Sequence, residues 1–433
     1  MDNKLVDNLQ HRALKLRIYP DREQEILINK TFGCARLVYN TRIAEKQNFY
    51  DNIIKTEEDK KKRKDLWKTA NFSSVKDLKI QFPFLAEPTA QSLSFSVLSA
   101  EKAYSNFLSS LTGKRKGRKM GLPKFKSKKS NDFSYKECMV SQKALDRGNK
   151  TIKVPKLGLI KYRKRNKIND FFSAKGAELK SITIRKNPAG EYYAVLLYER
   201  EYIRKPKTYS GDESKTIGLD FSPVDLYIDN NGISGKNYGY VAQKQFHKKQ
   251  LKKLQRRLMK KQKGSNNRRK ARIKVARLEN TITNKRLDFI EKETLRLVRN
   301  YELIGIENLN LQGMMKFSRN AKNYTDASWA TFVGKLQWKA SKNENNCQIV
   351  KIDRFFPSSQ LCSNCGFQNK KLKLSDRKWK CPECGIEHIR DINAAVNIKA
   401  EAKNILIASQ NLKPVESHKG LVAKRLAMLA ASA

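Results

Sequence analysis

The sequence has few acidic residues for its length and no long apolar run. Aspartate and glutamate number 42 against 91 lysines and arginines, which gives a formal net charge of +49. No run of about eighteen apolar residues occurs, and the first ten residues lack the hydrophobic region of a signal peptide. These absences argue against a membrane or secreted protein. The charge predicts a polyanionic partner, nucleic acid above all, and the alternative is a set of solvated basic faces.

Cysteine is also scarce, but four of the seven cysteines form two pairs with one spacing. Cys362 and Cys365 are separated by two residues, and after fifteen more residues Cys381 and Cys384 repeat this spacing. Two such pairs predict one tetrahedral site of four thiolates, which suits structural zinc because no ligand position stays open. The glycine directly after each pair suits a turn with positive φ. Such a site points to a reducing compartment and not to a disulfide framework.

The 433 residues are enough for two or three domains, and the pattern of apolar residues changes along the chain. In the first half, a capping box of Asp21 and Gln24 predicts the start of a long helix. The other elements expected there are a strand at 13–20, helices at 57–70 and 88–112, and short antiparallel strands between 133 and 203.

The second half, after a polar linker at 205–215, predicts buried strands and long helices. An Asn231-Gly232 turn closes the second strand. The expected elements are strands at Ile217–Phe221 and Leu226–Asp229, two helices within 243–300, a strand at 301–309 ending at Glu307, a helix at 326–343, a strand at 347–353 and a helix from Asp391.

Three acids occupy ends of these expected elements. Asp220 lies in the strand "IGLDFS", Glu307 in "IGIEN", and Asp391 at a helix start, where the helix dipole favours an acid in any role. Each acid alone is most simply a strand-end or capping residue. Together they could hold two divalent ions, such as Mg²⁺, that activate water for phosphodiester cleavage. Their order of strand, strand and helix fits an RNase H-like nuclease.

Motifs along nearly the whole chain resemble one family. The segments are "KLRIYPDREQEILINKTFGCARLVYN", "GLPKFKSKKSNDFSY", "VPKLGLIKY", "GLDFS", "IGIENL", "FFPSSQLCSNCG" and "CPECGIEHIRDINAAVNI". They are similar, in the same order, to TnpB, the RNA-guided nucleases of bacterial and archaeal insertion sequences that are related to type V CRISPR effectors. The resemblance implies that Asp220, Glu307 and Asp391 are the catalytic acids. It also implies that the four paired cysteines are zinc ligands.

The resemblance further implies an α+β multidomain fold, with an N-terminal β-barrel that carries a helical insertion and a C-terminal RNase H-like (RuvC) nuclease domain with an inserted zinc ribbon. The expected parts are a wedge-type β-barrel at 1–20 and 126–205, a helical recognition insertion at 21–125, the nuclease domain at 206–402, the zinc ribbon at 358–388 and a tail at 403–433.

The implied function is RNA-guided cleavage of double-stranded DNA beside a short motif, with Mg²⁺, or Mn²⁺ in its place, as catalytic ion and Zn²⁺ as structural ion. The partners would be a guide RNA and the DNA target, in a prokaryotic cytoplasm and at the nucleoid when bound to DNA. One departure is Ile389, where the family often has an acid. That acid is not one of the three assigned to the metals, so the expected activity stands.

Two basic segments are candidates for phosphate contact. Residues 114–129 carry nine lysines or arginines and residues 250–277 carry thirteen, with no acid in either segment. A guide RNA paired to DNA is recognised by shape and charge, and the alternative is again a solvated face. Arg390 either neutralises the scissile phosphate or is simply exposed. The candidates are Lys114, Arg115, Lys116, Arg118, Lys124, Lys126, Arg256, Arg257, Arg268, Arg269, Arg272 and Arg390.

Three rival functions stay open at this stage. A guided DNA-binding repressor would not cleave, although such a protein would be expected to have lost acids that are present here. A transposase that transfers DNA strands would act without RNA. A compact type V CRISPR effector would share the chemistry and differ in its genomic neighbourhood.

Overall fold

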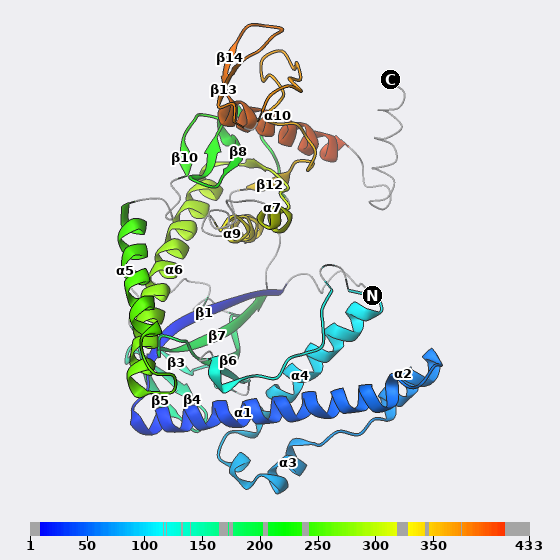
Figure 1. Ribbon diagram of the computed structural model, residues 1–433, viewed down its shortest axis with the longest axis vertical. Helices are drawn as coiled ribbons and strands as arrows, with labels where there is room; N and C mark the ends of the chain where they lie inside the picture. Colours follow the sequence, from blue (N-terminus) through cyan, green and yellow to red (C-terminus); the bar gives the residue numbers. More distant parts are fainter. Residues whose placement is uncertain are drawn as a thin grey trace. The chain divides into compact units, whose positions relative to one another are not determined.

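The chain divides into two compact units in the computed structural model (Figure 1). Unit 1 comprises Met1–Arg204 and Arg272–Arg277, and unit 2 comprises Lys205–Ala271 and Leu278–Ala433. The residues that the structure describes are 9–115, 117, 119–130, 133–138, 140–163, 172, 176–201, 207–235, 242–317, 328–342, 346–373 and 375–411. The predicted tail therefore lies largely outside the described residues.

Unit 1 contains a seven-stranded antiparallel sheet with the order β2-β6-β7-β1-β5-β4-β3. Its core gathers apolar side chains that alternate along the strands, such as Leu14, Leu16 and Ile18. The strands are β1 (Leu9–Tyr19), β2 (Phe133–Glu137), β3 (Leu145–Asp146), β4 (Thr151–Val154), β5 (Gly158–Tyr162), β6 (Glu178–Lys186) and β7 (Tyr192–Glu201). Because β2 and β3 end the order without pairing to each other, the described strands form an open sheet and not the closed barrel that we predicted.

Helix α1 (Arg22–Phe49) covers this sheet through Ile28 and Phe32. The predicted capping box is confirmed, because Asp21 Oδ1 accepts from the Gln24 amide and Gln24 Oε1 accepts from the Asp21 amide. Helices α2 (Lys60–Thr69) and α4 (Ala90–Leu111) lie where we expected helices. The short helix α3 (Val75–Gln81) was not predicted, because seven residues hold too little of the helical period.

Unit 2 contains a five-stranded sheet with the order β10-β9-β8-β11-β12. The central β8 pairs antiparallel with β9 and parallel with β11, and β11 pairs parallel with β12. The strands are β8 (Thr216–Ser222), β9 (Leu226–Asp229), β10 (Ser234–Gly235), β11 (Leu303–Ile306) and β12 (Gln348–Lys351). The predicted strands and the turn at Gly232, with its φ of 77°, are confirmed, although β11 ends one residue before Glu307.

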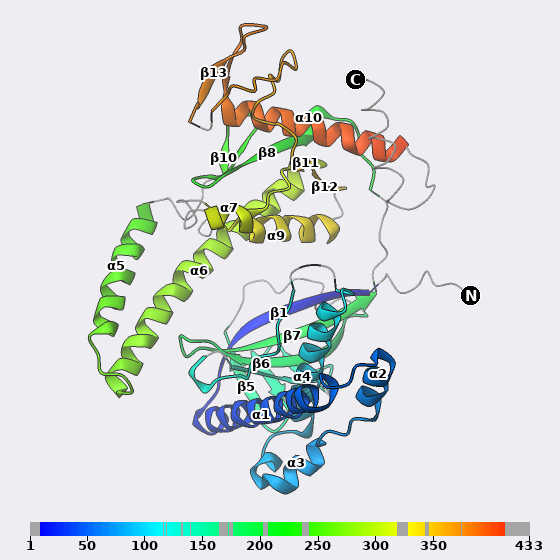
Figure 2. The same cartoon turned by 45° about the vertical axis from the view of Figure 1, so that its right-hand side comes forward.

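Helices cover both faces of this second sheet (Figure 2). Ile217, Leu219 and Ile304 point to one face, where they form a core with side chains of α6 (Asn266–Asn300) and α9 (Trp329–Lys342). Helix α10 (Arg390–Asn411) lies on the opposite face, with Ile398 and Ala402 buried against it. The other helices of the unit are α5 (Ala242–Met259) and α7 (Leu311–Phe317).

Two glycines allow α10 to lie directly on the sheet. A Cβ atom at Gly218 would come within 2.0 Å of the Ala395 carbonyl oxygen, and one at Gly305 within 2.8 Å of the Ile398 carbonyl oxygen. Both contacts are with helix backbone, which cannot swing aside as a flexible side chain can. Any larger residue at these positions would therefore push the helix away from the strands.

A small hairpin of β13 (Lys378–Lys380) and β14 (Glu387–Ile389) precedes α10 and carries the second cysteine pair in the connection between its strands. The hairpin runs directly into α10, since Ile389 is followed by Arg390. In the described part of the chain, no helix is both long enough and apolar enough to cross a membrane.

Gly218→Ala should loosen the packing of α10 on β8. The new methyl group meets backbone at 2.0 Å, so we expect a loss of about 2–3 kcal/mol in the free energy of unfolding of unit 2, measured by hydrogen exchange of the β8 and β11 amides. The control is Gly334→Ala within α9, where no atom lies within 4 Å and alanine should stabilise by about 0.5–1 kcal/mol. Equal protection in the two variants would contradict the close-packing argument.

Candidate functional site

The strand alternation places two of the three predicted acids on the face covered by α10. In β8, Ile217 and Leu219 point into the core with α6 and α9, so Gly218 and Asp220 point the other way. The same rule in β11 puts Gly305, and Glu307 just beyond it, on the α10 face. Each acid thus follows, two residues on, the glycine that lets α10 approach.

The register of β8 and β11 brings these two acids side by side. Gly218 pairs with Gly305 and Leu219 with Ile306 in the parallel ladder. The next residue along β8 is Asp220, and the residue that follows β11 is Glu307. Adjacent strands lie about 4.8 Å apart. Two carboxylates at neighbouring positions of one sheet edge are the consequence.

Helix α10 supplies the third acid in its first turn. Asp391 Oδ2 lies 3.2 Å from the guanidinium of Arg377 in the zinc-ribbon segment, and Asp391 Oδ1 lies 3.4 Å from that of Arg390. The N-terminal end of the helix dipole also favours a negative charge there. Two guanidinium groups therefore compensate the charge of this carboxylate.

The charges of the three acids act on one another. Desolvation, with the nearby carboxylates of Glu307 and Asp391, raises the pKa of Asp220 well above its ordinary value, and Arg390 opposes this rise. Desolvation also raises the pKa of Glu307, against the hydrogen bond that the Ser358 hydroxyl donates to Glu307 Oε1 at 2.9 Å. A divalent cation bound between these desolvated carboxylates would offset the repulsion between their negative charges, and carboxylate oxygens are ligands that Mg²⁺ and Mn²⁺ accept. The residues therefore fit either ion.

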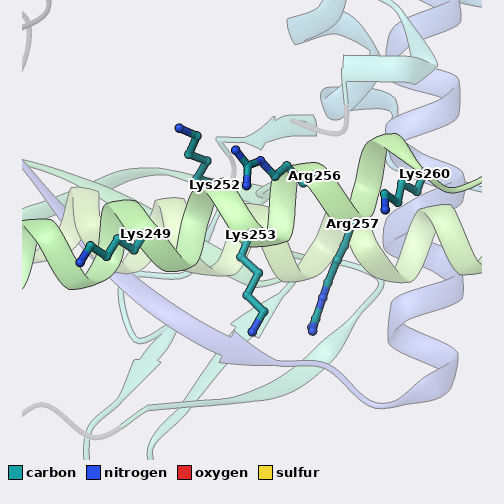
Figure 3. Close-up of a pocket in the computed structure, with 6 residues that line it drawn as sticks. All are labelled: Lys249, Lys252, Lys253, Arg256, Arg257 and Lys260. Carbon is teal, nitrogen blue, oxygen red and sulfur yellow. The ribbon is translucent and has the colours of Figure 1, made fainter.

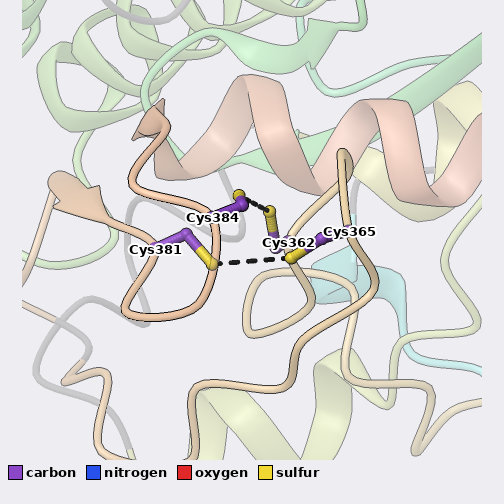
Figure 4. A group of neighbouring side chains, drawn as sticks. All are labelled: Cys362, Cys365, Cys381 and Cys384. Atoms are coloured by element: carbon purple, nitrogen blue, oxygen red, sulfur yellow. Dashed lines mark hydrogen bonds between the residues drawn. The ribbon is translucent and has the colours of Figure 1, made fainter.

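The four cysteines form the second site, and its geometry fits zinc (Figure 4). Their sulfur atoms all lie within 4.8 Å of one another, a compactness that no other ligand set reaches among the described residues, the three carboxylates included. Two of the separations are 3.6 Å, for Cys362 and Cys384, and 3.7 Å, for Cys365 and Cys381. A Zn–S distance of about 2.3 Å gives a tetrahedron with edges of about 3.8 Å.

Both halves of this site are built the same way. The amide of Gly366 donates to the Cys362 carbonyl and the amide of Gly385 to the Cys381 carbonyl, each at 2.9 Å. The φ angles of the two glycines are 79° and 73°, which confirms the prediction of positive φ. The amide of Ile386, with the neighbouring thiols, lowers the pKa of Cys384 to about 6. The pKa of Cys365 is raised instead, by desolvation and the neighbouring thiols against a hydrogen bond from the Phe367 amide.

His388 lies beside the cysteine site. Its Nε2 is 3.0 Å from Cys362 Sγ, and its ring packs on Trp379, with 4.8 Å between the centroids. Four thiolates complete a tetrahedral shell, so His388 is not expected to be a zinc ligand. The structure adds that the imidazole is a neighbour of one sulfur, where an N–H donor would stabilise the thiolate.

Sequence reasoning missed the residues that join the zinc ribbon to α10. Asn393 Oδ1 accepts from the Ser363 amide at 2.9 Å, and Asn393 Nδ2 donates to the Leu361 carbonyl at 2.6 Å. Asn397, one turn further, donates to the carbonyls of Leu361 and Ser358 at 2.8 Å each. Because Ser358 also bonds Glu307, these bonds connect the cysteine site to the acids. The signal in the sequence was two asparagines four residues apart in "DINAAVNI".

Helix α5 presents a group of exposed cations (Figure 3). Lysines and arginines spaced three or four residues apart line an open hollow of about 550 Å³ that no carboxylate borders. The predicted Arg256 and Arg257 belong to this group, three of the others lie within the predicted segment 250–277, and only Lys249 lies outside it. The lining residues are Lys249, Lys252, Lys253, Arg256, Arg257 and Lys260.

Some of the other predicted phosphate contacts have partners within the protein. Arg268 donates to the carbonyls of Leu258 and Lys261, and so closes the end of α5. Lys126 Nζ lies 4.0 Å from the centre of the Tyr39 ring. Arg390 pairs with Asp391, as described above. These contacts stabilise the fold and leave a role in phosphate binding as a prediction.

The remaining predicted contacts lie on the surface or outside the described residues. The exposed ones are Lys114, Arg115, Lys124, Arg269 and Arg272. Lys116 and Arg118 are among the residues that the structure does not describe. Phe125, which the sequence analysis overlooked, lies between Lys124 and Lys126 with 55% of its surface exposed, so this loop presents an aromatic ring as well as charge.

Asp220→Asn should raise the free energy of unfolding at about pH 7 without divalent ions. A carboxylate with a raised pKa binds its proton more tightly in the folded state, so its stabilising effect is complete below the ordinary aspartate pKa of about 4 and is lost as pH rises. The neutral amide avoids that loss. Denaturant titrations between about pH 4 and 8 should show a gap between variant and wild type that widens with pH. A gap that is absent or constant would contradict the assigned electrostatics.

Asn397→Ala should weaken the retention of zinc. It removes two hydrogen bonds that hold the segment leading into Cys362, and we expect roughly tenfold faster zinc loss to a coloured chelator. Asn404→Ala, on the exposed side of the same helix, is the matched control and should behave as wild type. Identical release from both variants would show that the asparagine does not secure the ribbon.

Three family models match separate parts of the chain. They are "Probable transposase" over residues 197–318, "Cas12f1-like, TNB domain" over 329–398 and "Helix-turn-helix domain" over 10–55. The second match covers the four cysteines and Asp391. In the structure, residues 10–55 form β1, α1 and one π-helical turn instead of two helices joined by a turn.

Near-full-length relatives extend these matches. "Putative RNA-guided DNA endonuclease" of Streptomyces pristinaespiralis is 29% identical over 93% of this chain and 92% of its own. "Putative RNA-guided DNA endonuclease InsQ" of Escherichia coli (strain K12) is 26% identical over 92% and 94%. The solved "Cas12f1-sgRNA-target DNA complex" shares the fold at a TM-score of 0.52 and 18% identity, over 91% of this chain and 99% of that one. These family models and near-full-length relatives confirm the predicted resemblance of the chain to the TnpB family.

Proposed function

We propose that this chain is an RNA-guided DNA endonuclease and that unit 2 is its RuvC-type nuclease domain. The observation that carries the proposal is that desolvation, together with the nearby carboxylates of Glu307 and Asp391, raises the pKa of Asp220. A group of desolvated acids in a chain of net charge +49 is a place for cations that face a polyanion. The names of the near-full-length relatives support the same activity.

The topology of unit 2 supports an RNase H-like domain. Its first three strands are antiparallel neighbours, and the fourth and fifth add in parallel beside the first, which gives the order third, second, first, fourth, fifth. In this arrangement the first strand, the end of the fourth and the helix after the fifth each contribute one acid. The sites of Asp220, Glu307 and Asp391 follow that pattern.

The chemistry divides between bound ions and protein groups. Two Mg²⁺ or Mn²⁺ ions would activate a water molecule and stabilise the leaving oxygen of the phosphodiester. The three acids would hold the ions, with Ser358 orienting Glu307 through its hydroxyl. Arg377 and Arg390, which now pair with Asp391, would then be available to the phosphate on either side of the cut. The zinc ribbon would keep a structural role.

Guide RNA and double-stranded DNA are the proposed partners. The cationic hollow on α5 and the exposed basic residues between 114 and 130 would bind the phosphates of the paired guide and target. The helices within 21–125 would act as the recognition insertion on the wedge-type sheet of 1–20 and 126–205 and would read the motif beside the target. Binding of this kind should weaken steeply with salt.

Asp391→Ala should abolish cleavage and leave RNA binding unchanged, since it removes an ion ligand and no basic residue. The RNA that co-purifies with the protein is sequenced first, and a DNA target matching its variable end is then incubated with the complex and Mg²⁺. We expect cutting to fall at least about a thousandfold. The matched control is Asp288→Ala, because that acid is 63% exposed and pairs with Lys292 on α6.

The same assay separates the rival functions. Tight guided binding without product, in the wild type, would support a repressor and overturn the nuclease. Absence of any bound RNA would support a strand transferase. Cleavage by Asp391→Ala at the wild-type rate would refute the assigned site, and omission of Mg²⁺ from the wild type should reproduce the defect of the variant.

A further inference from the structure

The turn after β12 lies next to Glu307 and is tightly held. Asp353 Oδ1 accepts from the Phe355 amide at 2.9 Å, and the Asp353 carbonyl accepts from the Phe356 amide. The Ser358 amide then donates to the Phe356 carbonyl at 2.8 Å, and the Ser358 hydroxyl reaches Glu307. Four hydrogen bonds therefore hold the turn, and its last residue contacts a predicted catalytic acid.

Two consecutive phenylalanines in this turn have opposite environments. Phe356 packs against a buried cluster of Ile352 with Ile398 and Ala402 of α10. Phe355 exposes 85% of its surface, a larger fraction than any other large hydrophobic residue in the described part of the chain. Single exposed apolar residues are common and need no explanation by themselves. This ring, however, is carried by a turn whose backbone is hydrogen-bonded, three residues from Ser358.

A cation accompanies the ring. Arg354 Nε donates to the carbonyl of Asn308, the residue directly after Glu307, at 3.4 Å. The neighbouring acid, Asp353, already accepts the Phe355 amide. The turn thus offers a flat π-face and a guanidinium group, both fixed to segments that carry or contact Glu307. These are the two groups that recognise the two parts of a nucleotide, its base and its phosphate.

We propose that Phe355 and Arg354 form a binding site for one unpaired nucleotide of the DNA strand that is cut, with the base stacked on Phe355 and the phosphate paired with Arg354. The strand must be single there, because in a duplex the faces of each base are covered by its neighbours. The inference rests on the proposed nuclease function. In this arrangement the protein binds the DNA strand through a stacked base near the scissile bond, in addition to its contacts with phosphates.

The test measures stacking directly and needs no guide. Single-stranded DNA that contains 2-aminopurine is titrated onto the full chain carrying Asp391→Ala, which prevents cutting. Stacking on Phe355 should quench the fluorescence. Phe355→Ala in this background should abolish the quenching and weaken strand binding roughly five- to a hundredfold, and Phe355→Trp should restore both. Arg354→Gln should keep the quenching and lower the slope of log affinity against log salt by about one.

The matched control is Phe84→Ala, which removes an equally simple ring that is 50% exposed in unit 1. It should leave quenching and affinity at the values of the parent. In the guided reaction with Asp391 intact, Phe355→Ala should raise KM more than it lowers kcat, because the ring binds the strand and takes no part in the chemistry.

The failure of this inference differs from the failure of the proposed function. Guided cleavage by the wild type, together with unchanged quenching and KM in Phe355→Ala, would overturn the nucleotide site and leave the nuclease standing. A defect that Phe355→Trp does not restore would also overturn it, as would a partner protein that occupies Phe355 while DNA does not. A wild type that never cuts would refute the nuclease, and the quenching titration would still decide whether this turn binds a base.

Discussion

The contact between the backbone of α10 and the glycines of β8 and β11 determines where the acids of unit 2 meet. A helix normally lies about 10 Å from the sheet beneath it, because side chains separate the two layers. Here Gly218 and Gly305 remove that separation, and Ala395 and Ala402 do the same on the helix. The first turn of α10 is therefore brought to the edge where β8 and β11 present their acids. The raised pKa of Asp220 is the electrostatic cost of that packing.

The zinc ribbon is joined to the same helix by hydrogen bonds and by chain connection. Asn393 and Asn397 bind the segment that leads into the first cysteine pair, and β14 runs directly into α10 after the second pair. A zinc ion that closes the four thiolates would hold both segments in place, and with them the first turn of α10. The metal expected to be structural and the acids expected to be catalytic are thus parts of one connected network, through Ser358 and Glu307.

The high positive charge is divided between binding surface and internal structure. The six cations on α5 face a hollow without acids, as a phosphate-binding surface requires. Arg268, by contrast, binds two carbonyls at the end of α5, and Arg377 and Arg390 compensate Asp391. A count of lysines and arginines in a segment therefore overstates the number available to nucleic acid. The surface of unit 2 also presents an exposed aromatic ring, Phe355, which carries no charge.

The sequence by itself determined the local features of this protein. The spacing of Cys362, Cys365, Cys381 and Cys384 depends on a short turn, the capping box of Asp21 and Gln24 on one helical turn, and the strands around Asp220 on alternation along a few residues. All of these constraints act between residues close together in the sequence, so the sequence alone is enough to predict them. Only the tertiary structure decided that the described N-terminal strands form an open sheet, that Asp220 and Glu307 follow two residues paired in register, and that Asn397 and Ser358 link the ribbon to the acids. Those facts depend on which segments distant in sequence come into contact. The packing of the whole unit sets these contacts, and the absence of a Cβ atom at Gly218 is one feature on which that packing depends.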